Sequence, residues 1–401
     1  MEPTHAMWLY LNERMTGADI AGLSEWCERR GVRKLFVHLK QKGPYPEWQT
    51  ERLERLFDVC EAAGIEAHAL VSALQQHASG REELWFGDRD CYCVDAHGIS
   101  SYDEPIAGRG YLLDPGKDEV VRGVAANCAD LLRRFPRLRG IHLDFIRYYH
   151  YDSRLVIDAK SAGHWIVKPK PGDPIQLGLA DGSATTYFVE SVRNVHNDPP
   201  IGDELVLKRS FRYCFCGSCV AGFERFGGIP VPEELKGKTE ETAGWLLEHR
   251  RAEWADYRAS MITRTVAAVR EAVREADPGA KLSATVWYNA PYGNELRGEP
   301  LTPGSDYDCF GQHWPAWAEH GLVDFLCPMD YWLGPDSFGE VVADQVRRTR
   351  GRLPIYAGVL HQPSEFELTE ESFAEYEARA LKAGAAGLCF FHYGTWSRLL
   401  D

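Results

Sequence analysis

Two aspartates, Asp144 and Asp330, stand at the ends of short apolar segments, 140–145 and 323–329. A carboxylate pair ringed by Trp, Tyr, His and Asn is what glycosidic cleavage needs, because one carboxylate attacks or stabilises an oxocarbenium-like centre while the other protonates the leaving oxygen. The alternative is structural, with each aspartate capping a helix or pairing with Arg147. Asp324 opens its segment, and we therefore expect it to be structural.

Polar and aromatic side chains also follow the other apolar segments of the chain. The first segment ends in Tyr10 and Asn12. Aromatic faces stack on the apolar faces of sugars, and their polar tips form hydrogen bonds. The residues that we expect to bind a sugar substrate are His38, Arg147, Tyr148, Trp287, Tyr288, Asn289, Tyr331, Trp332, His361, His392 and Tyr393. His68 lies inside an apolar segment, which favours a place in the core.

Five of the eleven cysteines are clustered, as a Cys91/Cys93 pair and a Cys214-x-Cys216-x-x-Cys219 run. Three thiolates at that spacing can reach one tetrahedral ion, with a fourth ligand from Cys91 or Cys93. We assign Cys93, which gives the set Cys93, Cys214, Cys216 and Cys219. Four thiolates leave no open position, so a zinc ion there would be structural and would not activate water. Metal-free thiols, or a disulfide in an exported protein, are the alternatives.

Eight apolar segments alternate with amphipathic helices along the chain. The strands and helices that they predict must position the candidate catalytic, binding and metal-ligating side chains. Such an alternation indicates a parallel sheet buried on both faces, and eight units indicate an α/β fold of the (β/α)8 TIM barrel type. The strands are expected at 7–12, 34–39, 65–71, 140–145, 282–287, 323–329, 355–360 and 387–391. An open doubly wound sheet is the alternative, but no Gly-x-Gly-x-x-Gly turn follows the first strand.

The stretch 152–208 interrupts this alternation after the fourth strand. It is rich in Gly, Pro and Asp, and short apolar pieces alternate in it with turns. We therefore expect a barrel formed by 1–151 and 209–401, and a small all-β insertion over 152–208 that serves as a rim or lid.

Composition narrows the classes of partner. The 401 residues carry a net charge of −14, which repels phosphate backbones and argues against nucleic acid. No apolar run reaches the ~20 residues that span a bilayer, so a membrane is not expected. The N-terminus has no signal-like basic and apolar regions, which predicts a cytoplasmic, reducing location. The sequence predicts no particular oligomeric state.

The segment Gly140-Ile141-His142-Leu143-Asp144-Phe145-Ile146-Arg147-Tyr148 resembles the fourth-strand motif of glycoside-hydrolase-like family ten proteins. The resemblance covers most of the chain outside 152–208, including Pro328-Met329-Asp330-Tyr331, but Tyr149 replaces the proline usual after Ile-Arg-Tyr. It implies a (β/α)8 barrel and glycoside hydrolysis. The cysteine cluster is similar to the structural zinc site of family 42 β-galactosidases.

Related retaining α-glycosidase barrels carry the nucleophile on strand four and the acid/base on strand six. By that resemblance Asp144 is the nucleophile and Asp330 the acid/base. His142, Asp144 and Ile146 occupy the places of the chitinase Asp-x-Asp-x-Glu pattern, which disfavours the chitinase mechanism. The neighbours of Asp330 are apolar, so its pKa should be raised, whereas Arg147 should keep Asp144 ionised.

The sequence thus favours a glycoside hydrolase that acts with two Asp carboxylates on an oligosaccharide or glycoside, and the family resemblance implies a retaining mechanism. One rival is a non-catalytic carbohydrate-binding barrel with the same fold and aromatics. A second is a barrel hydrolase that uses zinc catalytically.

Overall fold

The structure is a computed structural model that describes residues 4–39, 45–78, 81–106, 110–158, 169–178, 184–194, 203–288, 305–361 and 368–396. Its internal contacts divide the chain into two compact units. The first consists of Met1–Ala73, Asp118–Arg147 and Arg258–Asp401, and the second of Leu74–Lys117 and Tyr148–Tyr257. Each unit is described by itself.

The first unit is a (β/α)8 barrel, which confirms the fold that the sequence predicts. Its eight strands are all parallel and follow the order β12-β11-β6-β3-β2-β1-β14-β13. A parallel bridge between Leu326 and Ile355 connects the two ends of that order. The strands are β1 (His5–Leu9), β2 (Val32–His38), β3 (Glu66–Ser72), β6 (Gly140–Asp144), β11 (Lys281–Val286), β12 (Phe325–Pro328), β13 (Tyr356–Leu360) and β14 (Gly387–Phe391).

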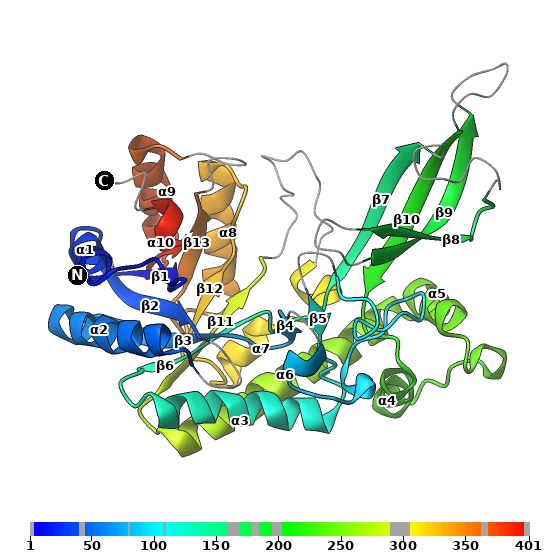
Figure 1. Cartoon of the computed structure of the whole chain (residues 1–401), viewed down its shortest axis with the longest axis horizontal. Coiled ribbons are helices and arrows are strands. Elements are labelled where there is room, and N and C mark those ends of the chain that lie inside the picture. Colours follow the sequence, from blue (N-terminus) through cyan, green and yellow to red (C-terminus); the bar gives the residue numbers. More distant parts are fainter. Residues whose placement is uncertain are drawn as a thin grey trace. The chain divides into compact units, whose positions relative to one another are not determined.

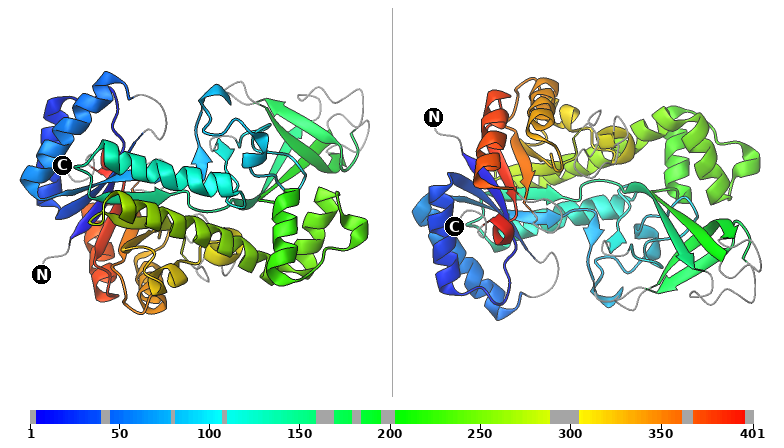
Figure 2. Two further views of the ribbon diagram at one scale, coloured as in Figure 1. Left: turned by 90° about the horizontal axis from the view of Figure 1, so that it is seen from below. Right: turned by 90° about the horizontal axis from the view of Figure 1, so that it is seen from above.

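The two ends of the chain meet in the sheet, because β1 pairs with β14 through Ala6 and Cys389. Figure 2 shows this arrangement as blue strands beside red ones. Every residue of β1 and β13 is buried, and so is every residue of β14 except the last, Phe391. Burial on both faces is what a parallel sheet covered by helices requires, and it explains the continuous apolar segments.

Helices cover the outside of the barrel strands (Figure 1). They are α1 (Gly17–Arg29), α2 (Glu47–Ala63), α3 (Asp118–Arg134), α6 (Arg251–Ala276, in this unit from Arg258), α7 (Trp314–Glu319), α8 (Pro335–Arg348), α9 (Glu370–Lys382) and the short α10 (Tyr393–Trp396). Thr16 begins α1 with a capping box that includes Asp19, and Gly64 ends α2 in the left-handed conformation. None of the helices among the described residues is both long and apolar enough to cross a bilayer.

Aromatic and imidazole rings fill the barrel interior. Trp8, Phe36 and Phe325 belong to one buried cluster. The ring of His142 stacks on Phe36 with 3.7 Å between centroids, and its two nitrogens contact the hydroxyls of Ser283 and Thr285. His68 is fully buried, as its position inside an apolar segment predicts. The interior is therefore a packed core, as in other barrels of this type.

Asp324 precedes β12 at the amino-terminal end of the strand. Its two oxygens accept hydrogen bonds from Arg270 at 2.6 and 2.9 Å, and one also accepts from the backbone N–H of Leu282 at 2.7 Å. These contacts tie α6 and β11 to the start of β12, which is the structural role expected for this aspartate.

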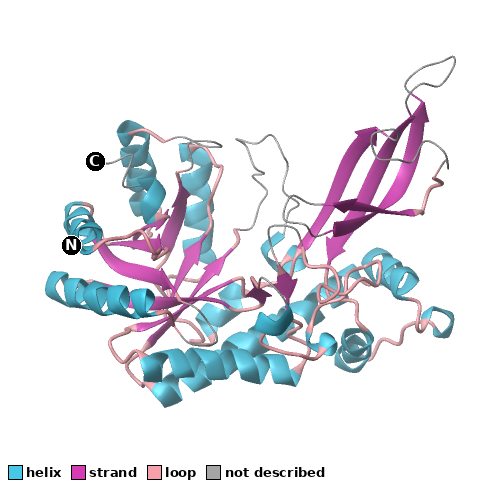
Figure 3. Cartoon of the chain, viewed as in Figure 1, coloured by secondary structure: helices cyan, strands magenta, loops and turns pink. Residues whose placement is uncertain are grey.

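The second unit contains an antiparallel sheet in the order β7-β10-β9-β8, seen as the group of magenta strands at the upper right of Figure 3. The strands are β7 (His150–Asp158), β8 (Pro174–Gly178), β9 (Ala184–Asn194) and β10 (Asp203–Arg212). The expected insertion, 152–208, lies within this unit, although its piece 165–167 falls outside the described residues. Leu205 and Leu207 of β10 pack on Ile175 and Val189 in a separate apolar cluster.

Other parts of the second unit lie outside the expected insertion. They include the short pair β4 (Gln75–Gln76) and β5 (Tyr111–Leu112), and the helices α4 (Gly217–Gly227) and α5 (Thr239–His249). A buried ion pair joins the loop before β5 to the sheet, because Arg209 of β10 contacts Asp95 at 2.9 Å and Glu104 at 2.6 Å. The side chains of Arg209 and Asp95 are 1% and 0% exposed.

Candidate functional site

Asp144 is the last residue of β6. It therefore lies at the carboxyl end of a barrel strand, which is where TIM-barrel enzymes place their reacting groups. Its Oδ1 accepts a hydrogen bond from the backbone N–H of Phe145 at 2.7 Å and lies 3.5 Å from Nη1 of Arg147. No described residue forms a hydrogen bond with the second oxygen, Oδ2. One oxygen is therefore held by the backbone, while the other accepts no hydrogen bond from a described residue.

Two tyrosines, Tyr10 and Tyr331, lie close enough to Asp144 to interact electrostatically with its carboxylate. Burial raises the pKa of both the Tyr10 and the Tyr331 phenols, and the negative charge of Asp144 raises each further. The ring of Tyr10 packs between His38 and His392, with centroid distances of 5.4 and 5.3 Å. Residues at or just after the carboxyl ends of β1, β2, β12 and β14 thus lie near the carboxylate at the end of β6.

Arg147 connects the same carboxylate to two aromatic rings. Its guanidinium lies 4.4 Å from the ring centre of Phe145 and 5.9 Å from that of Trp287. The ring of Trp287 is stacked with that of Trp332, with 6.5 Å between centroids and 21° between planes. These rings have the parallel orientation that suits the flat faces of a sugar.

Asp330 lies two residues beyond the end of β12 and is 2% exposed. Its Oδ1 accepts a hydrogen bond of 2.5 Å from the Nε2 of Gln345 on α8, and its Oδ2 is buried without a hydrogen-bond partner among the described residues. Burial raises the pKa of this carboxyl group to about 8, even though the Gln345 amide acts in the opposite direction. At neutral pH Asp330 is therefore mostly protonated and can donate a proton.

Backbone strain accompanies both carboxyl groups. Phe145, directly after Asp144, has φ +50°, and Trp332, two residues after Asp330, has φ +59°. Non-glycine residues rarely adopt this left-handed conformation, and such outliers concentrate at functional sites.

The other expected substrate-binding residues do not all join this group. Tyr288 is fully buried, and its hydroxyl donates to the Tyr331 carbonyl at 3.5 Å. His361 is 3% exposed, with Nδ1 accepting from the Leu368 N–H. Tyr393 packs edge-on against Trp26 of α1. Asn289 falls outside the described residues.

Sequence reasoning missed three contributors. Tyr10 directly follows β1, and the sequence analysis did not assign it to the site. Gln312 is fully buried and holds two strand ends, because it accepts from the Trp287 N–H at 2.9 Å and donates to the carbonyls of Ile146 and Thr285. Gln345 lies on a helix facing Asp330. The two glutamines act through tertiary contacts, which leave no local signal in the sequence.

The second unit brings the clustered cysteines together with an aspartate. One ligand atom each from Asp114, Cys214, Cys216 and Cys219 lies within 4.8 Å of all the others. Cys216 caps the start of α4, and its sulfur accepts from the backbone N–H of Cys219 at 3.4 Å. Thiol and carboxylate donors in this arrangement fit a tetrahedral ion such as zinc.

Asp114 replaces Cys93 in this group, which departs from the expected ligand set. The Cys93 sulfur instead donates to the Leu113 carbonyl at 3.3 Å and contacts Cys214, while Cys91 accepts from the Asp114 N–H through its carbonyl. Burial, and next the charge of Cys216, raise the pKa of Asp114 to about 7. A buried carboxylate among thiolates is electrostatically unfavourable unless a cation is bound.

Tyr148, expected to bind substrate, lies in this second unit instead. Burial raises the pKa of its phenol, and the charges of Cys219 and Asp114 raise it further. Its side chain thus contributes to the surroundings of the cysteine cluster.

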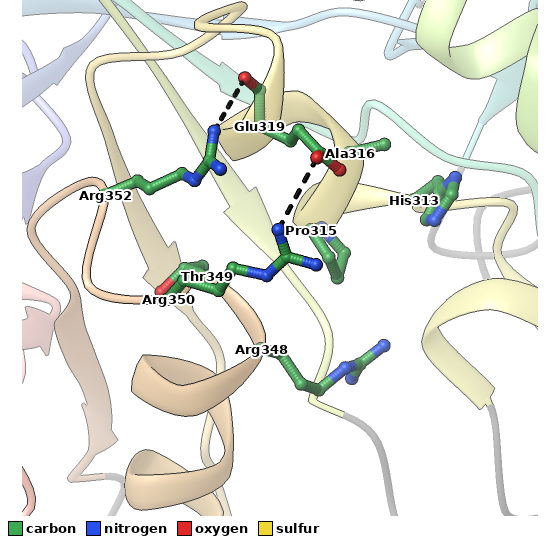
Figure 4. A pocket seen from close by; sticks show the side chains of 8 residues that line it. All are labelled: His313, Pro315, Ala316, Glu319, Arg348, Thr349, Arg350 and Arg352. Atoms are coloured by element: carbon green, nitrogen blue, oxygen red, sulfur yellow. Dashed lines mark hydrogen bonds and ion pairs between the residues drawn. The ribbon is translucent and has the colours of Figure 1, made fainter.

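Figure 4 shows a pocket whose lining is rich in arginine, unlike the surroundings of Asp144 and Asp330. Its lining includes Arg348, Arg350 and Arg352, from the end of α8 and the connection into β13, together with Glu319 of α7. Connections from helix to strand lie at the amino-terminal end of a barrel, where residues serve stability. Basic residues there also complement the negative end of the α8 dipole. We therefore do not include this pocket in the candidate active site.

No family profile matches the chain. Three curated relatives, each called glycosyl hydrolase DigH, come from Escherichia coli K12, Escherichia coli O157:H7 and Shigella flexneri. Each is 30% identical over 129 residues, which is 28% of this chain and 28% of the relative. The match therefore spans less than a third of either protein. It supports a likeness to a glycosyl hydrolase, but membership of glycoside-hydrolase-like family ten stays a prediction.

Solved structures with the same fold cover nearly the whole chain. The glycoside hydrolase domain of PgaB (BpsB) from Bordetella bronchiseptica is 10% identical with a TM-score of 0.59, covering 100% of this chain and 96% of that one. The β-amylase catalytic domain from Paenibacillus polymyxa is 11% identical, with a TM-score of 0.57 and coverages of 98% and 92%. The family 42 β-galactosidase Gan42B from G. stearothermophilus is 12% identical, with a TM-score of 0.53 and coverages of 98% and 51%. At these identities the likeness establishes the fold alone.

Proposed function

We propose that this protein hydrolyses O-glycosidic bonds with Asp144 and Asp330 as the two reacting carboxyl groups. The observation that carries the proposal is the asymmetric environment of Asp144. Its Oδ1 is anchored by the Phe145 N–H and faces Arg147, while its Oδ2 has no hydrogen bond among the described residues. A nucleophile needs this combination, because one oxygen fixes the orientation and the other attacks.

Asp330 has the opposite environment, which suits the proton donor. Its carboxyl group is buried, and its pKa of about 8 keeps it protonated at neutral pH. Glycosidases depend on such a separation, with one carboxyl group ionised and the other protonated under the same conditions.

The substrate is proposed to be an oligosaccharide or glycoside. Its rings would stack on Trp287 and Trp332, and its hydroxyls would bond to polar groups near Asp144. The proposed substrate-binding residues are those that lie near Asp144 or carry the stacked rings, namely Tyr10, His38, Arg147, Trp287, Tyr331, Trp332 and His392. The buried Tyr288 and His361, Tyr393 beside Trp26, and Tyr148 of the second unit are left out, and Asn289 stays a prediction from the sequence. The names of the relatives and of the structural neighbours, which are glycosyl hydrolases, an amylase and galactosidases, support this class of substrate.

The protein is further proposed to carry one structural zinc ion in its second unit. Cys214, Cys216 and Cys219 supply three ligands, and either Cys93 or Asp114 supplies the fourth. A closed set of four protein ligands would stabilise the loops that bear them and leave no position for a substrate or water.

One observation favours a second candidate, a carbohydrate-binding barrel without catalysis. The hydrogen bond from Gln345 occupies one oxygen of Asp330, and burial hides the whole carboxyl group. A purely structural Asp330 would show the same contacts. The two candidates differ in whether the wild-type protein turns over any sugar.

The test is Asp144→Asn, assayed on a panel of gluco-, galacto- and N-acetylated oligosaccharides that the wild-type protein cleaves. We expect kcat to fall by several orders of magnitude while sugar binding survives, because the amide cannot attack or stabilise a cation. Asp324→Asn is the matched control, because it changes another aspartate next to a barrel strand and should lower only stability. Near-normal turnover by Asp144→Asn would remove the assignment. A wild-type protein that binds sugars but cleaves none of them would favour the binding barrel.

A further inference from the structure

We propose that the cysteine cluster of the second unit binds a divalent metal through three sulfurs and one oxygen, with Asp114 as the fourth ligand and Cys93 outside the coordination shell. The inference deepens the structural-metal part of the proposed function and is independent of the glycosidase chemistry. It replaces the all-thiolate set that the cysteine spacing favours.

The distances around Asp114 match those between neighbouring ligands of one ion. Its Oδ2 lies 3.2 Å from the sulfur of Cys216, and both of its oxygens lie 3.3 Å from that of Cys219. With Zn–S of about 2.3 Å and Zn–O of about 2.0 Å, tetrahedral geometry places a sulfur and an oxygen ligand roughly 3.5 Å apart. The carboxylate is therefore already at coordinating distance from two of the thiols.

The backbone around Asp114 fixes the carboxylate in place. The N–H of Gly116 donates to Oδ1 at 2.8 Å, and the N–H of Asp114 donates to the Cys91 carbonyl at 2.9 Å. A Cβ atom at Gly116 would lie 2.8 Å from the Cys219 sulfur and 2.9 Å from Oδ1. Glycine is needed here because the chain passes directly against the cluster. Asp114 itself is fully buried.

Cys93 has a different role. Its sulfur lies 3.3 Å from the Leu113 carbonyl oxygen, and Cys93 is not a member of the group of four ligand atoms that lie within 4.8 Å of one another. Its side chain also contacts Cys214, whose sulfur accepts from the Val94 N–H at 3.3 Å. These are the contacts of a group that orients a ligand from outside the coordination shell.

Three thiolates and one carboxylate exceed the charge of a divalent ion, so the site also needs nearby cations or hydrogen-bond donors that offset the excess negative charge. Lys117 lies within the electrostatic reach of Cys216 and Asp114, and the Tyr257 hydroxyl contacts the Cys219 sulfur. A sulfur-rich tetrahedral set selects zinc, for which cobalt is a spectroscopic substitute of similar geometry.

The experiment measures the ligands of the metal-loaded, full-length protein directly. X-ray absorption at the zinc edge of the wild-type protein should give three sulfurs at about 2.3 Å and one oxygen at about 2.0 Å. After cobalt substitution, Asp114→Cys should raise the sulfur-to-cobalt absorption by about a third, because a fourth thiolate is added to three. Cys93→Ser is the matched variant and should leave this intensity unchanged.

The outcomes separate the ligand set from the other proposals. Four sulfurs in the wild-type spectrum, or a loss of sulfur-to-cobalt intensity in Cys93→Ser, would overturn the assignment of Asp114. An oxygen ligand with no gain of intensity in a folded, metal-loaded Asp114→Cys would identify the oxygen as water and overturn it too. A protein that binds no zinc would refute the metal site altogether, yet it would leave the roles of Asp144 and Asp330 to their own assay.

Discussion

Gln345, on the buried face of α8, donates a hydrogen bond of 2.5 Å to one oxygen of Asp330, while the other oxygen of that carboxyl group is buried without a partner among the described residues. A single amide donor does not compensate for the loss of water around a carboxylate. The uncharged acid is therefore the favoured form in the folded protein, with a pKa of about 8.

The first prediction concerns pH. If Asp330 is the proton donor, activity should fall as pH rises through about 8, because the acid loses its proton there. Gln345→Leu removes the donor that stabilises the ionised form, so it should raise the pKa of Asp330 and move this limb to higher pH. The measurement is kcat/KM against pH for both proteins. If the variant folds normally and its loss of activity at high pH does not shift, that loss must come from the ionisation of another group.

The raised pKa also links Asp330 to stability. An unfolded aspartate titrates near about 3.9, so the folded state holds a proton that the unfolded state has lost between that value and about 8. The stability due to this group is therefore complete below pH of about 4 and is lost as pH rises to 8. Urea unfolding across this range should show a decline that is weaker in Asp330→Asn, whose side chain does not titrate.

The next prediction concerns metal removal. Protein purified without added zinc should contain about one equivalent, and a chelator should lower its melting temperature because a closed site contributes folding energy. Activity of the fraction that stays folded should be unchanged. Cys216→Ser should lower metal content and melting temperature together, whereas Cys60→Ser, a buried cysteine of α2, is the control for metal content. Loss of activity at constant fold would indicate a catalytic metal.

The barrel could be predicted from the sequence because its signals are local. Each strand is a short apolar run, the helices have their own periodicity, and some of them carry local caps, as at Thr16 and Gly64. Asp144 and Asp330 could be selected for the same reason, since each follows a strand. The sequence analysis did not predict α4 and α5, which lie between the irregular insertion and the long helix α6.

The partners of the site residues could not be predicted in the same way. Gln345 reaches Asp330 only through the packing of α8, and Gln312 reaches two strand ends only after the barrel closes. Asp114 lies about a hundred residues from the cysteines that it approaches, and cysteine spacing alone favoured Cys93. Such contacts depend on the tertiary fold, which no local pattern encodes.

A further prediction concerns the buried ion pair of the second unit. Arg209→Leu leaves Asp95 and Glu104 without their cation, and breaking such a pair costs about 3–5 kcal/mol. The free energy of unfolding should fall by about this amount. Arg154→Leu is the control, because Arg154 is an exposed arginine that pairs with Glu190 on the same sheet, and it should change stability by less than about 1 kcal/mol. Equal losses of unfolding free energy in the two variants would mean that the buried ion pair stabilises the fold no more than the exposed one.

The last prediction concerns the stereochemistry of the product. Retention needs the two carboxyl groups about 5–5.5 Å apart, and inversion needs about 6.5–9.5 Å to admit a water molecule. Strands β6 and β12 flank β11, so their backbones are separated by roughly twice the ~4.8 Å strand spacing. Two short aspartate side chains reach the smaller separation only if they converge.

We expect retention, because the Oδ2 of Asp144, which accepts no hydrogen bond from a described residue, is suited to bond the anomeric carbon while Asp330 gives its proton to the leaving oxygen. Asp330, then ionised, would take a proton from the water that breaks the bond to Asp144. NMR of the first product, recorded before mutarotation, distinguishes the outcomes. An inverted anomer would mean that no covalent bond forms, and Asp144 would then act as a general base that activates water from the opposite face of the sugar.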